Sequence, residues 1–157
     1  MIFAVGGISA FAGALLARRA AETLGLVRSM VAGVAIAGVG LMLVPMARGS
    51  GVHGTSMLIA NQLIADGAFT IFIVNYSSFV QIVTSDEILG RVNSCLMFLG
   101  RVAALARSLI GGVLGTALGL RAPLYIAALG TMLAAVMLLA VPEKIAPASQ
   151  SLAEAAE

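Results

Sequence analysis

The sequence has little charge, few aromatic residues and almost no cysteine. Only 10% of its 157 residues are charged and 5% are aromatic, with no tryptophan, one histidine and one cysteine. A single cysteine, Cys95, excludes a disulfide within the chain and a metal site built from several cysteines. The net charge of +2 is small, and no basic cluster contains aromatic residues, so we expect no nucleic-acid partner.

Motifs that hold metal ions, phosphates or catalytic nucleophiles are also missing. The sequence contains no His-Glu-x-x-His, no Gly-x-Ser-x-Gly and no phosphate-binding loop. With one histidine and one cysteine, a nucleophile paired with a base would need unusual groups. We therefore expect no enzyme activity, no metal site and no cofactor.

Apolar residues dominate what is present. They make up 61% of the chain, and the mean hydropathy is +1.08. Soluble domains carry about 25% charged residues, so this composition indicates a membrane protein whose main partner is the lipid bilayer. Five segments are long enough to cross a bilayer as helices, namely 1–17, 29–47, 55–83, 92–119 and 122–141. The sequence predicts an all-α, polytopic membrane helix bundle over residues 1–141, followed by a polar cytoplasmic tail at 142–157.

The basic residues between these segments predict an orientation. With five spans, one side of the membrane receives Arg18, Arg19, Arg28, Arg91 and Lys144, and the other receives Arg48 and Arg121. The positive-inside rule places the first set in the cytoplasm, so the N-terminus is expected outside and the C-terminus in the cytoplasm. The membrane is expected to be the plasma (inner) membrane. A start outside the membrane, without an upstream signal, leads us to expect further helices before Met1.

The fourth segment combines charge with small residues. Arg101 and Arg107 lie near its middle, where a charge costs roughly 2.5–3.5 kcal/mol to insert and normally faces a protein interior or a water-filled cavity. Gly111, Gly115 and Gly119 follow at a spacing of four, which allows another helix to approach closely. This segment therefore predicts both a polar environment and a close helix neighbour.

The third segment contains the strongest functional candidate, Asp66, at a depth similar to that of Arg107. Either the two form a switch coupled to substrate or protons, or they form a static buried ion pair that orients the helices. Arg101 either lines a cavity or extends toward the cytoplasmic face. Asn75 and Gln81 either contact substrate or bond to a neighbouring helix.

Two local patterns predict finer features. Thr84 and Glu87 have the spacing of a capping box, with Thr84 as the N-cap of the next helix. The run Leu24-Gly-Leu-Val-Arg28 after the first segment is echoed by Leu118-Gly-Leu-Arg121 after the fourth. The span count puts these runs on opposite faces of the membrane, as an inverted repeat would.

Three longer motifs carry a resemblance to a known family. They are Gly13-Ala-Leu-Leu-Ala-Arg18-Arg19 followed by Leu24-Gly25, then Asn75 through Asn93 with its Gln81, Thr84-Ser-Asp86 and Gly90-Arg91-Val, and last Gly111-Gly112 through Ala122. Together they resemble helices eight to twelve of a major facilitator superfamily transporter, most closely its drug and siderophore exporter branch. The sequence departs from that pattern at Ala17 (usually an acid), Ser85 (usually proline) and Arg107 (usually a small residue).

The resemblance implies a function and a set of residues. The parent activity would be export of small amphipathic or hydrophobic compounds by alternating access, driven by an ion gradient. It also implies a cytoplasmic gate or loop that involves Gly13, Arg18, Arg19, Asp86, Gly90 and Arg91. The alternatives are that Arg18 and Arg19 serve only as topology charges and that Asp86 serves only as the acidic start of a helix. Such transporters have twelve helices in two halves, so the expected partner is a missing N-terminal half or a second copy, and the chain alone is expected not to transport. The alternative is a small membrane scaffold or partner subunit that oligomerises through its glycine-rich and polar helix faces.

Overall fold

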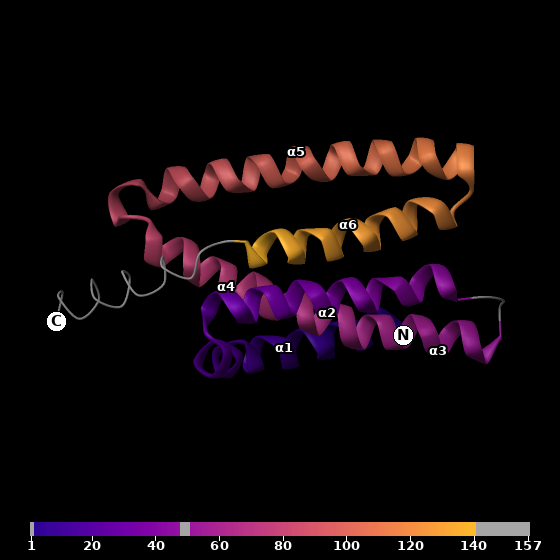
Figure 1. Ribbon diagram of the computed structural model, residues 1–157, viewed down its shortest axis with the longest axis horizontal. Coiled ribbons are helices and arrows are strands. Elements are labelled where there is room, and N and C mark those ends of the chain that lie inside the picture. The colour runs from indigo at the N-terminus through magenta and orange to yellow at the C-terminus, as the bar shows by residue number, and fades with distance from the viewer. Residues whose placement is uncertain (1, 48–50, 141–157) are drawn as a thin grey trace.

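The structure, a computed structural model, describes residues 2–47 and 51–140, which form an all-α bundle (Figure 1). The described part contains no strand, so the predicted fold class is confirmed. Its elements in chain order are α1 (Ile2–Leu24), α2 (Leu26–Met46), α3 (Val52–Asn61), the π-helical turn η1 (Gln62–Asp66), α4 (Gly67–Val83), α5 (Asp86–Leu118) and α6 (Arg121–Leu139). Because α3, η1 and α4 are continuous, they form one long segment, and the bundle has five such segments.

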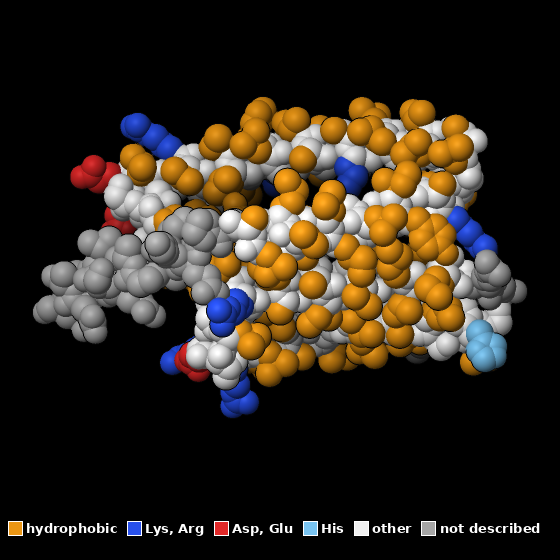
Figure 2. All heavy atoms as spheres, viewed as in Figure 1, with side chains coloured by type: hydrophobic (Ala, Val, Ile, Leu, Met, Phe, Trp, Pro, Cys, Tyr) orange, Lys and Arg blue, Asp and Glu red, His pale blue; other side chains and the backbone are white. Residues whose placement is uncertain are grey.

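Four of the five segments are long and apolar enough to cross a membrane. They are α2, the continuous segment Val52–Val83, α5 and α6. Figure 2 shows apolar side chains along the length of the bundle and charged side chains mostly toward its ends. This arrangement is compatible with a membrane protein. That α1 also spans, and which way the bundle faces, stay predictions.

The helix ends differ from the predicted ones at three places. α1 continues past the predicted end at residue 17 as far as Leu24, so its polar end is also helical. On the exposed face of this end, the Arg18 guanidinium contacts the Glu22 carboxylate at 2.8 Å. The third segment begins at Val52, so His53 lies in a helix and not in a loop. The predicted capping box is wrong, since Ser85 is the N-cap of α5 without a side-chain cap bond and Thr84 instead ends α4. The predicted tail and Arg48 lie outside the described residues.

α1, α2 and the third segment pack closely because glycines of α1 and α2 lie against glycine and alanine of the third segment. A Cβ added at Gly13 would overlap the backbone carbonyl of Gly67. One added at Gly33 would lie 2.8 Å from the Ala68 carbonyl oxygen, and one at Gly40 would lie 3.0 Å from the Ala65 Cβ. Small residues let helix backbones approach in this way.

The face of α1 that is buried against the third segment consists of Gly6, Ser9, Gly13 and Ala17. These follow a spacing of three and four, as a 3.6-residue helical period requires. Ser9, although polar, is tolerated on this face because its hydroxyl donates to the Leu63 carbonyl of the facing segment.

α5 and α6 complete the bundle unevenly. α6 packs along α2, where Ala128 and Ala135 are buried and Gly38 faces Met132. α5 is the outermost helix in Figure 1, contacts mainly α6, and has no buried residue along its 33 residues. A helix of this length and apolar character therefore has most of its surface uncovered by the other described helices.

The two Leu-Gly-Leu links adopt the same backbone conformation. Gly25, between α1 and α2, has φ 86° and ψ 156°, and Gly119, between α5 and α6, has φ 83° and ψ 159°. This region of backbone space is essentially restricted to glycine. The links lie at opposite ends of the bundle in Figure 1. The repeated sequence therefore corresponds to a repeated structure: two helical hairpins that point in opposite directions are joined by the same type of glycine link.

Candidate functional site

The centre of the third segment is interrupted by the π turn η1. A π turn inserts an extra residue into an α-helix, disturbs its regular hydrogen bonds and occurs often at functional sites. Two hydroxyl groups bond to carbonyls there: Ser9 of α1 donates to the Leu63 carbonyl, and Thr70 donates to the Asp66 carbonyl at 2.7 Å. A side chain of the facing helix therefore helps to hold the irregular turn.

Asp66 lies at the end of this turn, opposite Gly6 of α1. A Cβ added at Gly6 would overlap the Asp66 Oδ2 and would lie 2.7 Å from the Gln62 Nε2. The absence of a side chain at Gly6 thus makes the space that these two polar groups occupy. The Asp66 side chain is half-buried and has no ion-pair or hydrogen-bond partner among residues 2–47 and 51–140. An unpaired carboxylate at mid-length of an apolar helix costs free energy, so it points to function.

Asn61, one residue before the π turn, adds a second unsatisfied oxygen. Its Nδ2 donates to the Gln62 Oε1 at 3.4 Å, while its Oδ1 is buried and has no partner in the described part of the chain. The residue is only 8% exposed. We call Asn61, Gln62 and Asp66, together with Gly6, the π-turn cluster. It is an acceptor-rich polar group inside a bundle of apolar helices.

Asn75 has the structural role that was one of its two predicted readings. It is 3% exposed, and its Nδ2 donates to the Ser29 Oγ at 2.9 Å and to the Ala17 carbonyl at 3.4 Å. The amide therefore joins α4 to both α1 and α2. Ser29 in turn donates to the Leu26 carbonyl at 2.8 Å, so these bonds form a short buried chain.

The predicted pairing of Asp66 with Arg107 is absent from this structure. Asp66 faces α1, whereas Arg107 lies on the exposed helix α5, and no ion pair joins them. Arg107 instead lines an apolar groove of about 860 Å³ between α5 and α6, with Ile110, Leu114, Leu124 and Ala127 among its other walls. Figure 2 shows basic side chains in the hollow beneath α5. Arg101 is exposed and is not part of the lining of the groove.

The glycine row of α5 contacts no other helix within the described residues. Cβ atoms added at Gly111, Gly115 or Gly119 would meet nothing within 4 Å. Gly111 and Gly115 line the groove instead, and Gly119 forms the link to α6. The close helix neighbour predicted for this row is thus not among the described helices of this chain.

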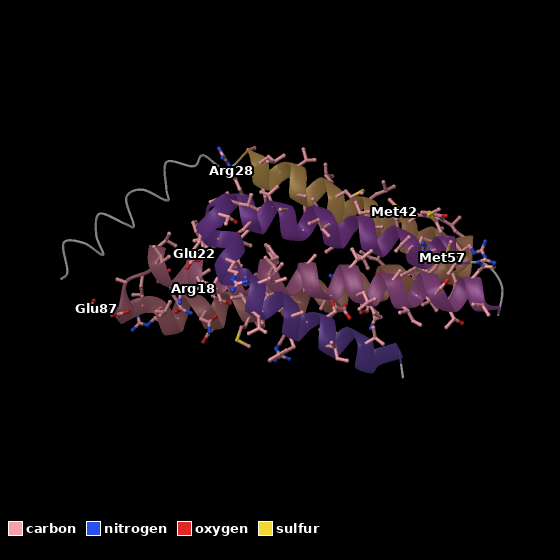
Figure 3. The ribbon with its side chains drawn as sticks, turned by 90° about the horizontal axis from the view of Figure 1, so that it is seen from below. Arg18, Glu22, Arg28, Met42, Met57 and Glu87 are labelled. Atoms are coloured by element: carbon pink, nitrogen blue, oxygen red, sulfur yellow. The ribbon has the colours of Figure 1, made fainter. Side chains whose placement is uncertain are left out.

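Of the predicted gate residues, Arg18 lies at the same end of the bundle as Glu22, Arg28 and Glu87 (Figure 3). Nearby, Gln81 and Gly90 line a small cavity of about 410 Å³ between α4 and α5. The other gate residues are placed separately: Arg19, Asp86 and Arg91 are exposed, and Gly13 lies deeper in the bundle against Gly67.

Sequence reasoning missed part of the π-turn cluster. It gave Asp66 a role but not Asn61, Gln62 or Gly6. The signal was present, since Asn61 and Gln62 immediately precede a charged residue in an otherwise apolar stretch. What could not be seen was the π turn, because the segment has no proline and the turn depends on packing against α1.

Comparisons of this chain with protein-family models, with curated proteins and with solved structures gave no match. The resemblance to the major facilitator superfamily therefore rests on the motifs quoted above.

Proposed function

We propose that this chain is a helical unit of a secondary transporter that exports small amphipathic or hydrophobic compounds by alternating access. The observation that carries this proposal is Asp66, a carboxylate that has no partner among residues 2–47 and 51–140 and lies at the π turn of a segment long enough to span a membrane. Intramembrane acids without a fixed partner are typical of ion pathways and coupled transport. Asp66 would respond to the driving ion, and α1 would move against the turn.

The inverted hairpins support the same class of protein. α1–α2 and α5–α6 are joined by Leu-Gly-Leu links with closely similar backbone angles, at opposite ends of the bundle. Transporters of the major facilitator type contain three-helix units related by inversion within each half. The third segment lies between the two hairpins, so the five segments match such a half without its first helix.

The groove between α5 and α6 supplies a surface for the substrate. Its walls are apolar apart from Arg107 and Thr116, which suits a compound with an apolar body and one polar or anionic group. The groove is open, and α5 has no buried residue. A second helical unit, either the missing half or another copy, would close the site.

Vesicle transport tests this function. Inverted membrane vesicles from cells that express the natural reading frame containing this chain would be given an ion gradient and a panel of fluorescent amphipathic dyes. We expect gradient-dependent uptake that Asp66→Asn abolishes and that the control Glu87→Gln, which removes an exposed carboxylate with no assigned role in transport, retains. Uptake equal to that of vesicles without the protein would refute transport.

The exposed face of α5 also favours a second candidate, a membrane scaffold that oligomerises through this helix. The free glycines at 111 and 115 are suited to close helix contact. Cross-linking in the membrane distinguishes the two candidates when combined with the vesicle assay: a stable oligomer without any gradient-dependent uptake favours the scaffold.

A further inference from the structure

We propose that the π-turn cluster binds a sodium ion through oxygens of Asp66, Gln62 and Asn61. This inference rests on the proposed transport function for its purpose, since it names the ion that would drive export. Ion binding itself is measured separately from transport, so the two proposals can fail separately.

The cluster has unpaired acceptors at the place where they are most costly. The Asp66 carboxylate has no partner in the described residues, and the buried Oδ1 of Asn61 has none either. Burying an unpaired charge or an unpaired carbonyl oxygen is unfavourable in an apolar surrounding. A cation compensates both groups at once. A proton on Asp66 neutralises the charge, but it adds only one donor.

The π turn brings the candidate ligands to one side of the helix. In a regular α-helix, residues five apart lie about 140° apart around the axis, since each residue turns about 100°. The wider π turn, with its i to i+5 bonding, places Asn61 and Asp66 roughly one turn apart. Gln62 lies between them: its Oε1 accepts from Asn61 and its Nε2 lies with Asp66 over Gly6. To serve as an ion ligand, the Gln62 amide turns by about 180°, which gives up the bond from Asn61 and directs the oxygen toward Asp66.

The donor set fits a small hard cation. Carboxylate and amide oxygens are the ligands such ions take in proteins, and interrupted helices near the bilayer midplane bind sodium in several transporters. Only one carboxylate is present, and residues 2–47 and 51–140 contain no group of three or more His, Cys, Asp or Glu side chains placed to hold a metal. One negative charge balances one positive charge, which favours a monovalent ion.

Thermal unfolding of the full chain in detergent tests the site. Sodium, potassium and choline chloride would be compared at one ionic strength, so that charge screening is constant. A ligand that binds only the folded state raises the unfolding temperature with its concentration. We expect a rise with sodium that saturates, and no comparable rise with potassium or choline.

Variants locate the effect. Asp66→Asn should lose the sodium response, and Gln62→Leu should raise the sodium concentration for half-maximal effect roughly tenfold or more. Gly6→Ala should do the same, because its Cβ displaces both head groups. Asp86→Asn, which removes an exposed carboxylate at the start of α5, is the matched control and should respond as the wild type does. If Asp66→Asn does not fold, Gln62→Leu and Gly6→Ala decide.

Three outcomes overturn the inference: no sodium-specific rise in the wild type, an equal rise with potassium, or an undiminished rise in the cluster variants. Gradient-dependent export without a sodium response would refute the ion site and leave the transport function standing. A sodium response lost in Asp66→Asn, without any export, would support the ion site and refute transport.

Discussion

The amide of Asn75 on α4 donates a hydrogen bond to the hydroxyl of Ser29 on α2, with 2.9 Å between Nδ2 and Oγ. Both residues are almost completely buried, at 3% and 1% exposure. The same amide reaches the carbonyl of Ala17, so one side chain fixes the relative positions of three helices. These bonds hold α1, α2 and α4 together near the α1–α2 link.

Replacing Asn75 should therefore destabilise the bundle by a measurable but modest amount. Hydrogen bonds between membrane helices average about 0.6 kcal/mol and reach about 1.7 kcal/mol. We expect Asn75→Ala and Ser29→Ala each to lower the free energy of unfolding, and the double variant to lose less than the sum. Unfolding in mixed micelles measures all three. Ser78→Ala, which removes a hydroxyl bonded only within α4, is the control, and additive losses would refute the coupling.

The contact of α1 with the third segment should tolerate no side chain at Gly13. Its Cβ would enter the Gly67 carbonyl, which belongs to the backbone and cannot rotate away. Overpacking of this kind costs about 1–3 kcal/mol. On the same helix, a Cβ at Gly7 would meet nothing within 4 Å. We thus expect Gly13→Ala to reduce stability and Gly7→Ala to leave it unchanged or raise it, and equal effects would contradict the described helix contact.

The features that could be predicted from the sequence are those that depend on residues close together in the chain. Long apolar runs between polar links predict helices well, so the five segments were foreseen from the sequence. Residues whose role depends on a facing helix were not: Ser9 was overlooked because its hydroxyl bonds to Leu63, 54 positions away. The pairing of Asp66 with Arg107 failed for a related reason, since similar depth along two helices does not mean that their side chains face each other.

Replacing the glycine of either Leu-Gly-Leu link by alanine should lower the stability of the bundle. Gly25 and Gly119 have φ of 86° and 83° with ψ near 160°, a conformation that costs a residue with a Cβ about 1–3 kcal/mol. The space around both is open, so the cost is backbone strain alone. Gly51→Ala, at φ −88° and also in open space, should be neutral. Stability equal to wild type for Gly25→Ala and Gly119→Ala would show that the links do not adopt this conformation.

The ion pair between Arg18 and Glu22 should contribute little to stability. It is an i, i+4 pair on an exposed face, with the arginine side chain 88% exposed. Such pairs contribute roughly 0.3–0.5 kcal/mol and weaken with salt. We expect Glu22→Gln to lower stability by no more than this, with the difference vanishing at high salt. A loss that persists at high salt would indicate a role for Glu22 beyond this pair.

Arg107 and Arg101 should behave alike in membrane insertion and differently in transport. Each charge costs roughly 2.5–3.5 kcal/mol at the centre of a spanning helix, so Arg107→Leu and Arg101→Leu should both improve insertion of α5 in a translocation assay. Only Arg107 lines the groove between α5 and α6, where it is the one charged residue. We therefore expect Arg107→Leu to reduce vesicle uptake of anionic amphipathic dyes strongly, and Arg101→Leu to reduce it little. Equal losses of uptake in the two variants would mean that both arginines act through the fold of α5. Unchanged uptake in both variants would show that the groove does not bind the transported dye.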